Sequence, residues 1–153
     1  MANVTFECKA FAELSTHELY AMLALRSEVF IVEQRCVYLD PDGLDLAAHH
    51  LFGWSATEPE ALVCGVRILG PGVSHAEPSI GRVVTSPKCR GRGMGRVLME
   101  RALVECARLY AGQGIRIGAQ QYLERFYAGL GFVTVSAPYD EDGILHVKML
   151  RSA

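Results

Sequence analysis

A segment rich in glycine and arginine carries the residues best suited to chemistry in this sequence. Arg90-Gly91-Arg92-Gly93-Met94-Gly95-Arg96 lies before a long stretch whose apolar residues recur at helical spacing. The free amides and the positive dipole end of a helix N-terminus attract anions. Glycine lacks a Cβ atom, so a phosphate can approach the backbone closely. The segment therefore predicts an anion-binding loop.

The loop lacks the marks of two common nucleotide sites. A Walker loop needs Lys-Ser or Lys-Thr after its last glycine, whereas Arg96-Val97 follows Gly95. A dinucleotide fingerprint starting at Gly91 would need a glycine where Arg96 stands. Judged alone, the loop could also be a solvated basic turn or an Arg-Gly stretch that contacts RNA. The net charge of -2 and the pI near 6.2 give no field that would attract nucleic acid or an anionic membrane, so we expect neither as a partner.

Length and composition indicate one globular domain spanning residues 1–153. The chain is 50% hydrophobic and 21% charged, and it is long enough to bury a continuous core. Its five cysteines are odd in number and scattered, without a C-x-x-C pair, so we expect no disulfide framework and no metal site. We see no signal peptide and no apolar run long enough to cross a bilayer, and we expect a cytoplasmic protein.

The elements that must position the loop follow from periodicity and turn signals. A capping box at Ser15 and Glu18 predicts the start of a first helix, and further helices are expected from Gly93 to about Tyr110 and over 122–130. Strands are expected at 4–8, 50–55, 62–69, 80–85, 115–119, 132–135 and 144–150. Strand, loop, helix and strand form a βαβ unit with parallel strands. The predicted class is α/β (α+β), a mixed sheet flanked by helices, antiparallel early and parallel at its centre.

Two motifs in the right order resemble the GNAT N-acetyltransferase superfamily. Arg90-x-x-Gly93-x-Gly95 after Arg82-Val83-Val84-Thr85 resembles its acetyl-CoA signature. The later Gln120-x-x-Leu123-x-x-Phe126-Tyr127-x-x-x-Gly131-Phe132 is similar to a superfamily segment that usually begins with Asn instead of Gln120. The segments 25–34, 42–45, 49–51, 80–84, 118–120 and 139–144 resemble the ElaA-like branch, whose acetyl acceptor is generally unassigned.

The resemblance implies acetyl-CoA as co-substrate and direct acetyl transfer to a primary amine in a ternary complex. It implies that the amides of 90–96 hold the pyrophosphate and that Gln120 contributes to the same site. The backbone of Val83, Val84 and Thr85 would pair with the pantetheine arm, and an amide near Val84 would polarise the thioester. Tyr127 would protonate the departing thiolate. The alternative is a regulatory module that binds acetyl-CoA or CoA without significant transferase activity.

The acceptor amine arrives protonated, so a base is needed. Glu33 is the first candidate; it lies seven residues after Arg26, and both are expected on a similar helix face. His49 and His50 are alternatives, of which at most one can face the site because strand side chains alternate. Together with Arg26 and Glu33, further residues are expected to line the acceptor pocket: Asp45, His49, His50, Arg82, His146 and the turn 140–142. We expect a small amine or peptide acceptor, and a monomer or homodimer.

Overall fold

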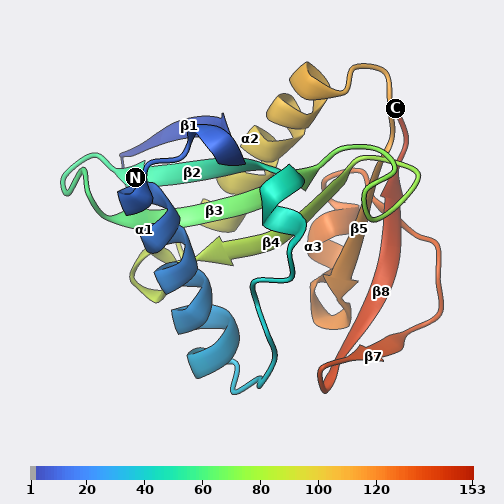
Figure 1. Cartoon of the computed structure of the whole chain (residues 1–153). Coiled ribbons are helices and arrows are strands. Elements are labelled where there is room, and N and C mark those ends of the chain that lie inside the picture. The colour runs from blue at the N-terminus through green and yellow to red at the C-terminus, as the bar shows by residue number, and fades with distance from the viewer. Residues whose placement is uncertain (1–2) are drawn as a thin grey trace.

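The computed structural model describes residues 3–153, which form one mixed sheet flanked by helices (Figure 1). The strand order is β1-β2-β3-β4-β5-β8-β6, and β7 pairs with β8. The predicted α/β (α+β) class is confirmed. The strands are β1 (Val4–Ala10), β2 (His49–Ser55), β3 (Leu62–Leu69), β4 (Ser79–Thr85), β5 (Ile115–Gln120), β6 (Val133–Thr134), β7 (Tyr139–Glu141) and β8 (Ile144–Arg151). The α-helices are α1 (Thr16–Arg26), α2 (Met94–Leu109) and α3 (Glu124–Ala128).

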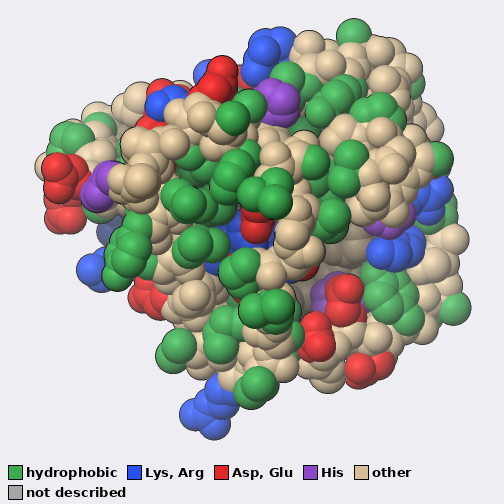
Figure 2. All heavy atoms as spheres, viewed as in Figure 1, with side chains coloured by type: hydrophobic (Ala, Val, Ile, Leu, Met, Phe, Trp, Pro, Cys, Tyr) green, Lys and Arg blue, Asp and Glu red, His purple; other side chains and the backbone are tan. Residues whose placement is uncertain are grey.

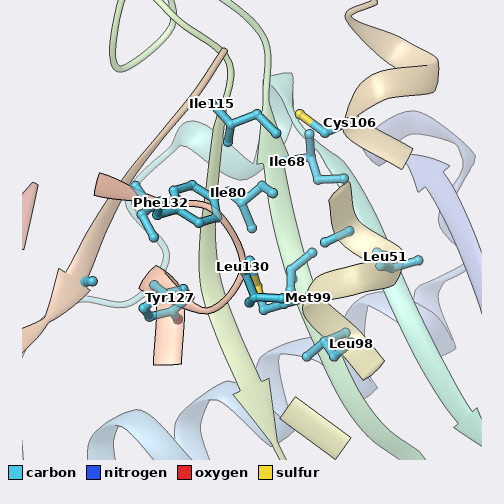
Figure 3. Packing of buried hydrophobic residues seen from close by; sticks show 14 of the residues in the cluster. Leu51, Ile68, Ile80, Leu98, Met99, Cys106, Ile115, Tyr127, Leu130 and Phe132 are labelled. Carbon is cyan, nitrogen blue, oxygen red and sulfur yellow. The ribbon is translucent and has the colours of Figure 1, made fainter. Parts of the chain in front are cut away.

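Helices α1 and α2 cover opposite faces of the β2–β4 region (Figure 1). The larger core lies between the sheet and α2, where Leu98, Met99 and Ala102 are completely buried (Figure 3). A smaller cluster on the other face joins Leu25 of α1 to Val84 of β4. Because apolar side chains pack on both faces of the sheet, β4 is held firmly at the level of Val84.

Strands β4 and β5 are parallel, as predicted, but they pair only where they begin. Their single register pair is Ser79 with Arg116, supported by a 2.9 Å hydrogen bond from the Arg116 amide to the Pro78 carbonyl. Beyond this pair the two strands diverge toward their carboxyl ends (Figure 1). The other strand pairs of the sheet are antiparallel. The sheet is therefore open between β4 and β5.

A β-bulge interrupts β4 beside this opening. From Gly65 to Arg67 the strand β3 advances two residues, while its partner β4 advances three, from Val84 to Gly81. Arg82 lies within the extra length and has a φ of 49°, a left-handed conformation that non-glycine residues rarely adopt. A bulge redirects the backbone groups next to it, here those of Val83 and Val84.

The first helix begins at the predicted capping box and changes its winding after Arg26. The Ser15 hydroxyl accepts from the Glu18 amide at 3.1 Å, and the Glu18 carboxylate accepts from the Ser15 amide at 2.8 Å. From Ser27–Glu33 the chain is a π-helix, whose wider turn rotates less per residue. The expectation that Arg26 and Glu33 share a face is therefore wrong. Arg26 is 2% exposed inside the protein, whereas the Glu33 side chain is 39% exposed.

Two later elements are shorter than predicted. The expected helix over 122–130 is a 3-10 turn at Gln121–Leu123 followed by α3, and the expected strand over 132–135 pairs only at Val133–Thr134. Gly131, with a φ of 92°, separates the two elements. No helix within residues 3–153 is long and apolar enough to cross a membrane.

Candidate functional site

A cavity of about 800 Å³ fills the opening between β4 and β5. Its walls come from β4, β5, the segment 29–44, the α3 region and the β7–β8 hairpin. Figure 2 shows a hollow on one face of the molecule with acidic, basic and histidine side chains around it. The divergence of two neighbouring strands thus produces the site, because the gap leaves backbone and side chains of both strands facing one space.

At one end the cavity reaches the glycine loop. α2 begins at Met94, and its N-cap Gly93 has a φ of 72°, a conformation that a residue with a Cβ atom adopts only at a cost. Arg90 donates to the Thr85 carbonyl at 3.1 Å and forms a 2.7 Å ion pair with Glu33. The loop thus lies at the N-terminus of a 16-residue helix, where free amides and the dipole favour an anion.

Tyr127 of α3 lies in the wall between the loop and the middle of the cavity. Its side chain is 6% exposed and makes edge-on contacts with Phe126 and Phe132, with ring centroids 5.0 and 6.1 Å away. Burial, followed by the nearby Tyr122, raises the pKa of Tyr127 to about 12. The phenol therefore stays protonated over the physiological pH range and can donate a hydrogen bond into the cavity.

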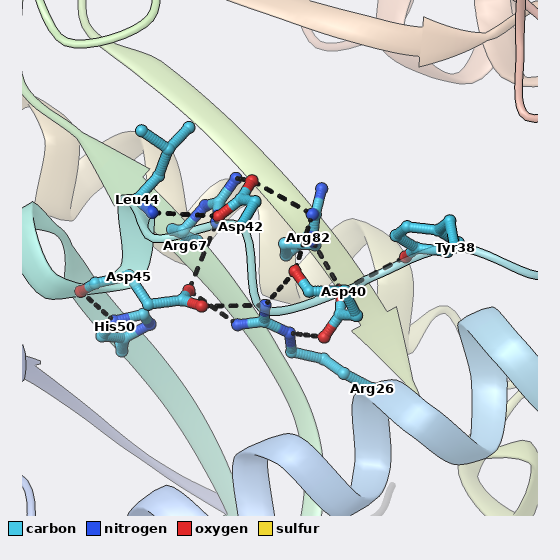
Figure 4. A network of polar contacts seen from close by, with 9 residues as sticks. All are labelled: Arg26, Tyr38, Asp40, Asp42, Leu44, Asp45, His50, Arg67 and Arg82. Carbon is cyan, nitrogen blue, oxygen red and sulfur yellow. Dashed lines mark hydrogen bonds and ion pairs between the residues drawn. The ribbon is translucent and has the colours of Figure 1, made fainter.

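Six charged residues form what we call the ionic cluster, which lies between α1, β3 and β4 (Figure 4). Its members are Arg26, Asp40, Asp42, Asp45, Arg67 and Arg82. Arg26 binds Asp40 through Nε at 2.8 Å, and it binds both oxygens of Asp45 at 2.8 and 3.1 Å. Three guanidinium groups balance three carboxylates, as a buried set of charges requires.

The ionic cluster also holds the bulge in β4. Arg82 donates to the Asp40 side chain at 2.7 Å, to the Asp40 carbonyl at 3.0 Å and to Asp42 at 3.2 Å. Burial would raise the Asp42 pKa, but hydrogen bonds from the Arg67 guanidinium and the Leu44 amide lower it to about 2. Asp42 is therefore ionised at neutral pH and holds Arg67 and Arg82 in place.

The β7–β8 hairpin forms the wall opposite the ionic cluster. The Nδ1 atom of His146 lies 2.8 Å from the Ile144 carbonyl and donates a hydrogen bond to it, because a carbonyl oxygen can only accept. The Nε2 atom of the same ring lies 3.3 Å from the Glu141 carboxylate. Lys148 points to the same side of β8, two residues further along. Cys36 donates to the Asp142 carbonyl at 3.1 Å and so connects the hairpin to the segment after the π-helix.

The structure brings many of the predicted site residues to this cavity and leaves others away from it. Those that line it are Glu33, Arg82, Val83, Val84, Thr85, Arg90, Gly95, Gln120, Tyr127, Glu141, Asp142 and His146. Of the loop 90–96, only Arg90 and Gly95 are among the described residues of the wall. Arg26 and Asp45 belong to the ionic cluster, and His50 is buried with its Nε2 3.1 Å from the Asp45 carbonyl. Arg26, Asp45, His49 and His50 are not among the described residues of the cavity wall. Any effect they have on a substrate is thus indirect, through Arg67 and Arg82.

Sequence reasoning missed Arg67, Asp40 and Lys148. A signal for Arg67 was present, because an arginine within the apolar run Leu62–Leu69 must either reach solvent or be paired. For Lys148 the period of two along Ile144–Arg151 places it on the same face as His146.

Comparison with known proteins identifies the family. Residues 45–152 match the acetyltransferase (GNAT) domain. The chain is 42% identical over 148 residues to a UPF0039 protein of Synechocystis, covering 97% of this chain and 95% of that protein. It is 42% identical over 142 residues to protein ElaA of Escherichia coli, covering 92% and 91%. The crystal structure of an acyl-CoA N-acyltransferase from Pseudomonas aeruginosa superposes with a TM-score of 0.93 at 43% identity, covering 98% of this chain and all of that one.

The open pair of parallel strands and the glycine loop that starts the next helix define an acyltransferase fold. The chain belongs to the acetyltransferase (GNAT) family, in its ElaA-like branch.

Proposed function

We propose that the protein transfers the acetyl group of acetyl-CoA directly to a primary amine in a ternary complex. The observation that carries this proposal is the single cavity that joins Arg90 and Gly95 of the loop to Tyr127 and to the bulge of β4. One space thus holds an anion site, a hydrogen-bond donor for sulfur and exposed strand backbone. Acyl transfer from a phosphate-bearing thioester needs these three features together.

The donor would lie along β4. The amides of 90–96 bind the pyrophosphate, with Arg90, Arg92 and Arg96 adding charge-assisted contacts. The pantetheine arm pairs with the backbone of 83–85, which β5 leaves free. Gln120 lies on the facing wall of the cavity, where its amide can contact the donor. The bulge at Arg82 directs an amide near Val84 toward the thioester oxygen, where it stabilises the oxyanion.

The chemical step is attack of the neutral amine nitrogen on the thioester carbon. A carbon–nitrogen bond forms, the carbon–sulfur bond breaks, and the sulfur leaves as a thiolate. Tyr127 donates a hydrogen bond to this thiolate, and the proton that the attacking nitrogen loses as the amide forms balances the one that the sulfur gains. Since a thiol has a pKa near 8.5 and the pKa of Tyr127 is about 12, full transfer is uphill. Hydrogen bonding to sulfur is therefore the larger part of its contribution.

Glu33 is the proposed base, and donor binding prepares it. In the free protein its carboxylate is occupied by Arg90 at 2.7 Å. When the phosphates of the donor attract Arg90, this pair separates and Glu33 becomes free to accept the proton of the acceptor ammonium. The same coupling predicts that the donor binds before the acceptor. We also propose a cytoplasmic location, where the five free cysteines stay reduced.

Thermal stabilisation by acetyl-CoA, CoA, ATP and NAD tests the donor site. A ligand at about 100 times its Kd adds about 2.7 kcal/mol, which is about 5–11 °C for a domain of this size. We expect this shift with acetyl-CoA and CoA only. An equal shift with ATP would reduce the loop to a general anion site. Stabilisation without thiol release from any amine would favour the regulatory module instead.

Two variants test the assigned roles through thiol release. Tyr127→Phe should keep acetyl-CoA affinity and lower turnover by about 10²-fold, the lower end of general-acid effects. Tyr122→Phe, at an exposed tyrosine of the same cavity, is its control. Glu33→Gln should lose most of its rate near neutral pH, whereas Glu28→Gln, on the same π-helix but outside the cavity wall, should not. Unchanged turnover in either test variant removes that residue from the mechanism.

A further inference from the structure

The charged side chains around the cavity form ion pairs with one another, except for those on the β7–β8 hairpin. The ionic cluster is neutral, and Glu33 is paired with Arg90. The ion pairs within residues 3–153 leave the Lys148 ammonium without a carboxylate partner. On the hairpin, Glu141 faces only His146, whose charge depends on its protonation. One positive group, Lys148, and two negative groups, Glu141 and Asp142, thus remain available to a ligand.

Hydrogen-bond donors without an acceptor gather around Lys148. Its Nζ lies 5.2 Å from the centre of the Tyr139 ring, a distance at which the ring stabilises a cation. The Tyr139 hydroxyl is buried and has no hydrogen-bond partner among the described residues. Both groups lie over Gly118 of β5, where a Cβ atom would be 3.0 Å from the hydroxyl and 3.4 Å from Nζ. Lys148, which lines the cavity, therefore lacks an acceptor oxygen, which a carboxylate in the cavity would supply.

His146 and Glu141 lie nearer to the reacting centre. His146 pairs with Gln120 at the open end of β5, and Lys148 pairs with Gly118, one step toward the closed end. The two side chains lie on one face of β8, about 6.5–7 Å apart along the strand. An ammonium between Nε2 of His146 and the Glu141 carboxylate would thus lie toward Tyr127, with Lys148 behind it.

We propose that the acetyl acceptor is a zwitterion of the α-amino-acid type, whose ammonium is held by Glu141 and His146 and whose carboxylate binds Lys148. This inference rests on the proposed transferase function and names the substrate class of the same site. A polyamine would place a second ammonium against Lys148, and a simple amine would leave Lys148 without an acceptor. Leu39, Leu44 and Ile144 line the same cavity and would contact an apolar side chain.

The test measures thiol release from acetyl-CoA with matched acceptors. The probes are the free L-amino acids, each beside its methyl ester and its decarboxylated amine, for example phenylalanine, phenylalanine methyl ester and phenethylamine. We expect at least one amino acid to exceed its ester and its amine in kcat/KM by at least about tenfold, the effect of one charge-assisted hydrogen bond.

Lys148 variants separate binding of the carboxylate from a general loss of structure. Lys148→Met should raise KM for the amino acid by about tenfold or more, and should leave kcat/KM for the decarboxylated amine unchanged. Lys148→Arg should recover most of the loss. Lys9→Met removes a lysine of β1 outside the cavity and should change neither value.

The outcomes distinguish the two proposals. Equal or faster turnover of esters and amines, or an equal effect of Lys148→Met on all three probes, overturns the amino-acid acceptor and leaves the transferase standing. No thiol release with any probe, despite stabilisation by acetyl-CoA, overturns the transferase proposal and this inference with it.

Discussion

Removing Arg26 should destabilise the protein more than any exposed charge does, because Arg26 is buried between two carboxylates. In Arg26→Met, Asp40 keeps Arg82 at 2.7 Å and Asp45 keeps Arg67 at 3.3 Å, so both carboxylates remain partly compensated. The ionic cluster nevertheless changes from three against three to two cations against three anions. Removal of one partner from a buried ion pair costs about 3–5 kcal/mol. With this partial compensation we expect about 3 kcal/mol, or a midpoint lower by about 6–12 °C.

Urea unfolding at pH 7 measures this loss, with an unchanged m-value as evidence that the unfolded state is the same. Arg96→Met removes a pair with Glu100 on α2 whose side chains are 54% and 53% exposed, and it should leave the midpoint nearly unchanged. The difference between wild type and Arg26→Met should shrink as the pH falls from 4 toward 2, because the pKa values of Asp42 and Asp45 are lowered in the folded wild type and their contribution is lost only in that range. A loss below about 1 kcal/mol, as at exposed pairs, would refute the view that these charges are buried and interdependent.

Three further predictions concern the bulge, acid stability and the thiols. Arg82→Gly should unfold at a higher midpoint than Arg82→Ala, because glycine tolerates the positive φ at this position. Both variants should lose turnover, because the hydrogen bonds that fix the backbone beside Val83 and Val84 are removed. Equal unfolding midpoints would contradict this. The Asp42 pKa near 2 is below its unfolded value near 3.9, so its contribution is complete above pH 4 and is lost as the pH falls toward 2; an acid titration of the unfolding free energy should show that decline. Burial raises the pKa of Cys64 to about 12 and of Cys106 to about 11, so a thiol reagent should modify these two only after denaturant is added, as peptide mapping can check.

Features set by local sequence were predictable. The capping box at Ser15, the glycine loop before α2 and the antiparallel pairing of β2 with β3 each depend on residues close together in the chain. Their physical causes are hydrogen bonds and backbone preferences within a few residues, which a single sequence displays directly. The positions of Val84, Gln120 and Tyr127 on the cavity wall followed from the same local elements and from the family resemblance.

Features that depend on distant contacts were not predictable. No residue pattern within Ser27–Glu33 indicates a π-helix. The π-helical turn places Glu33 beside Arg90, and not on the same face as Arg26. The ionic cluster joins Arg26 to residues up to 56 positions later in the chain, at Arg82, and no spacing rule connects them. The opening between β4 and β5 depends on where pairing stops, which the apolar runs of both strands do not show.

The burial of the ionic cluster is better explained by geometry than by stability. Well-packed apolar residues often stabilise a core as well as a buried ion pair does, because the charges lose their hydration. A left-handed non-glycine residue such as Arg82 also costs about 1–2 kcal/mol. What Arg82 gains is three hydrogen bonds that fix it to Asp40 and Asp42, beside the backbone of Val83 and Val84. We therefore infer that the cluster sets the direction of the β4 backbone beside the cavity, so that α1, which contributes no described residue to the cavity wall, still influences its shape.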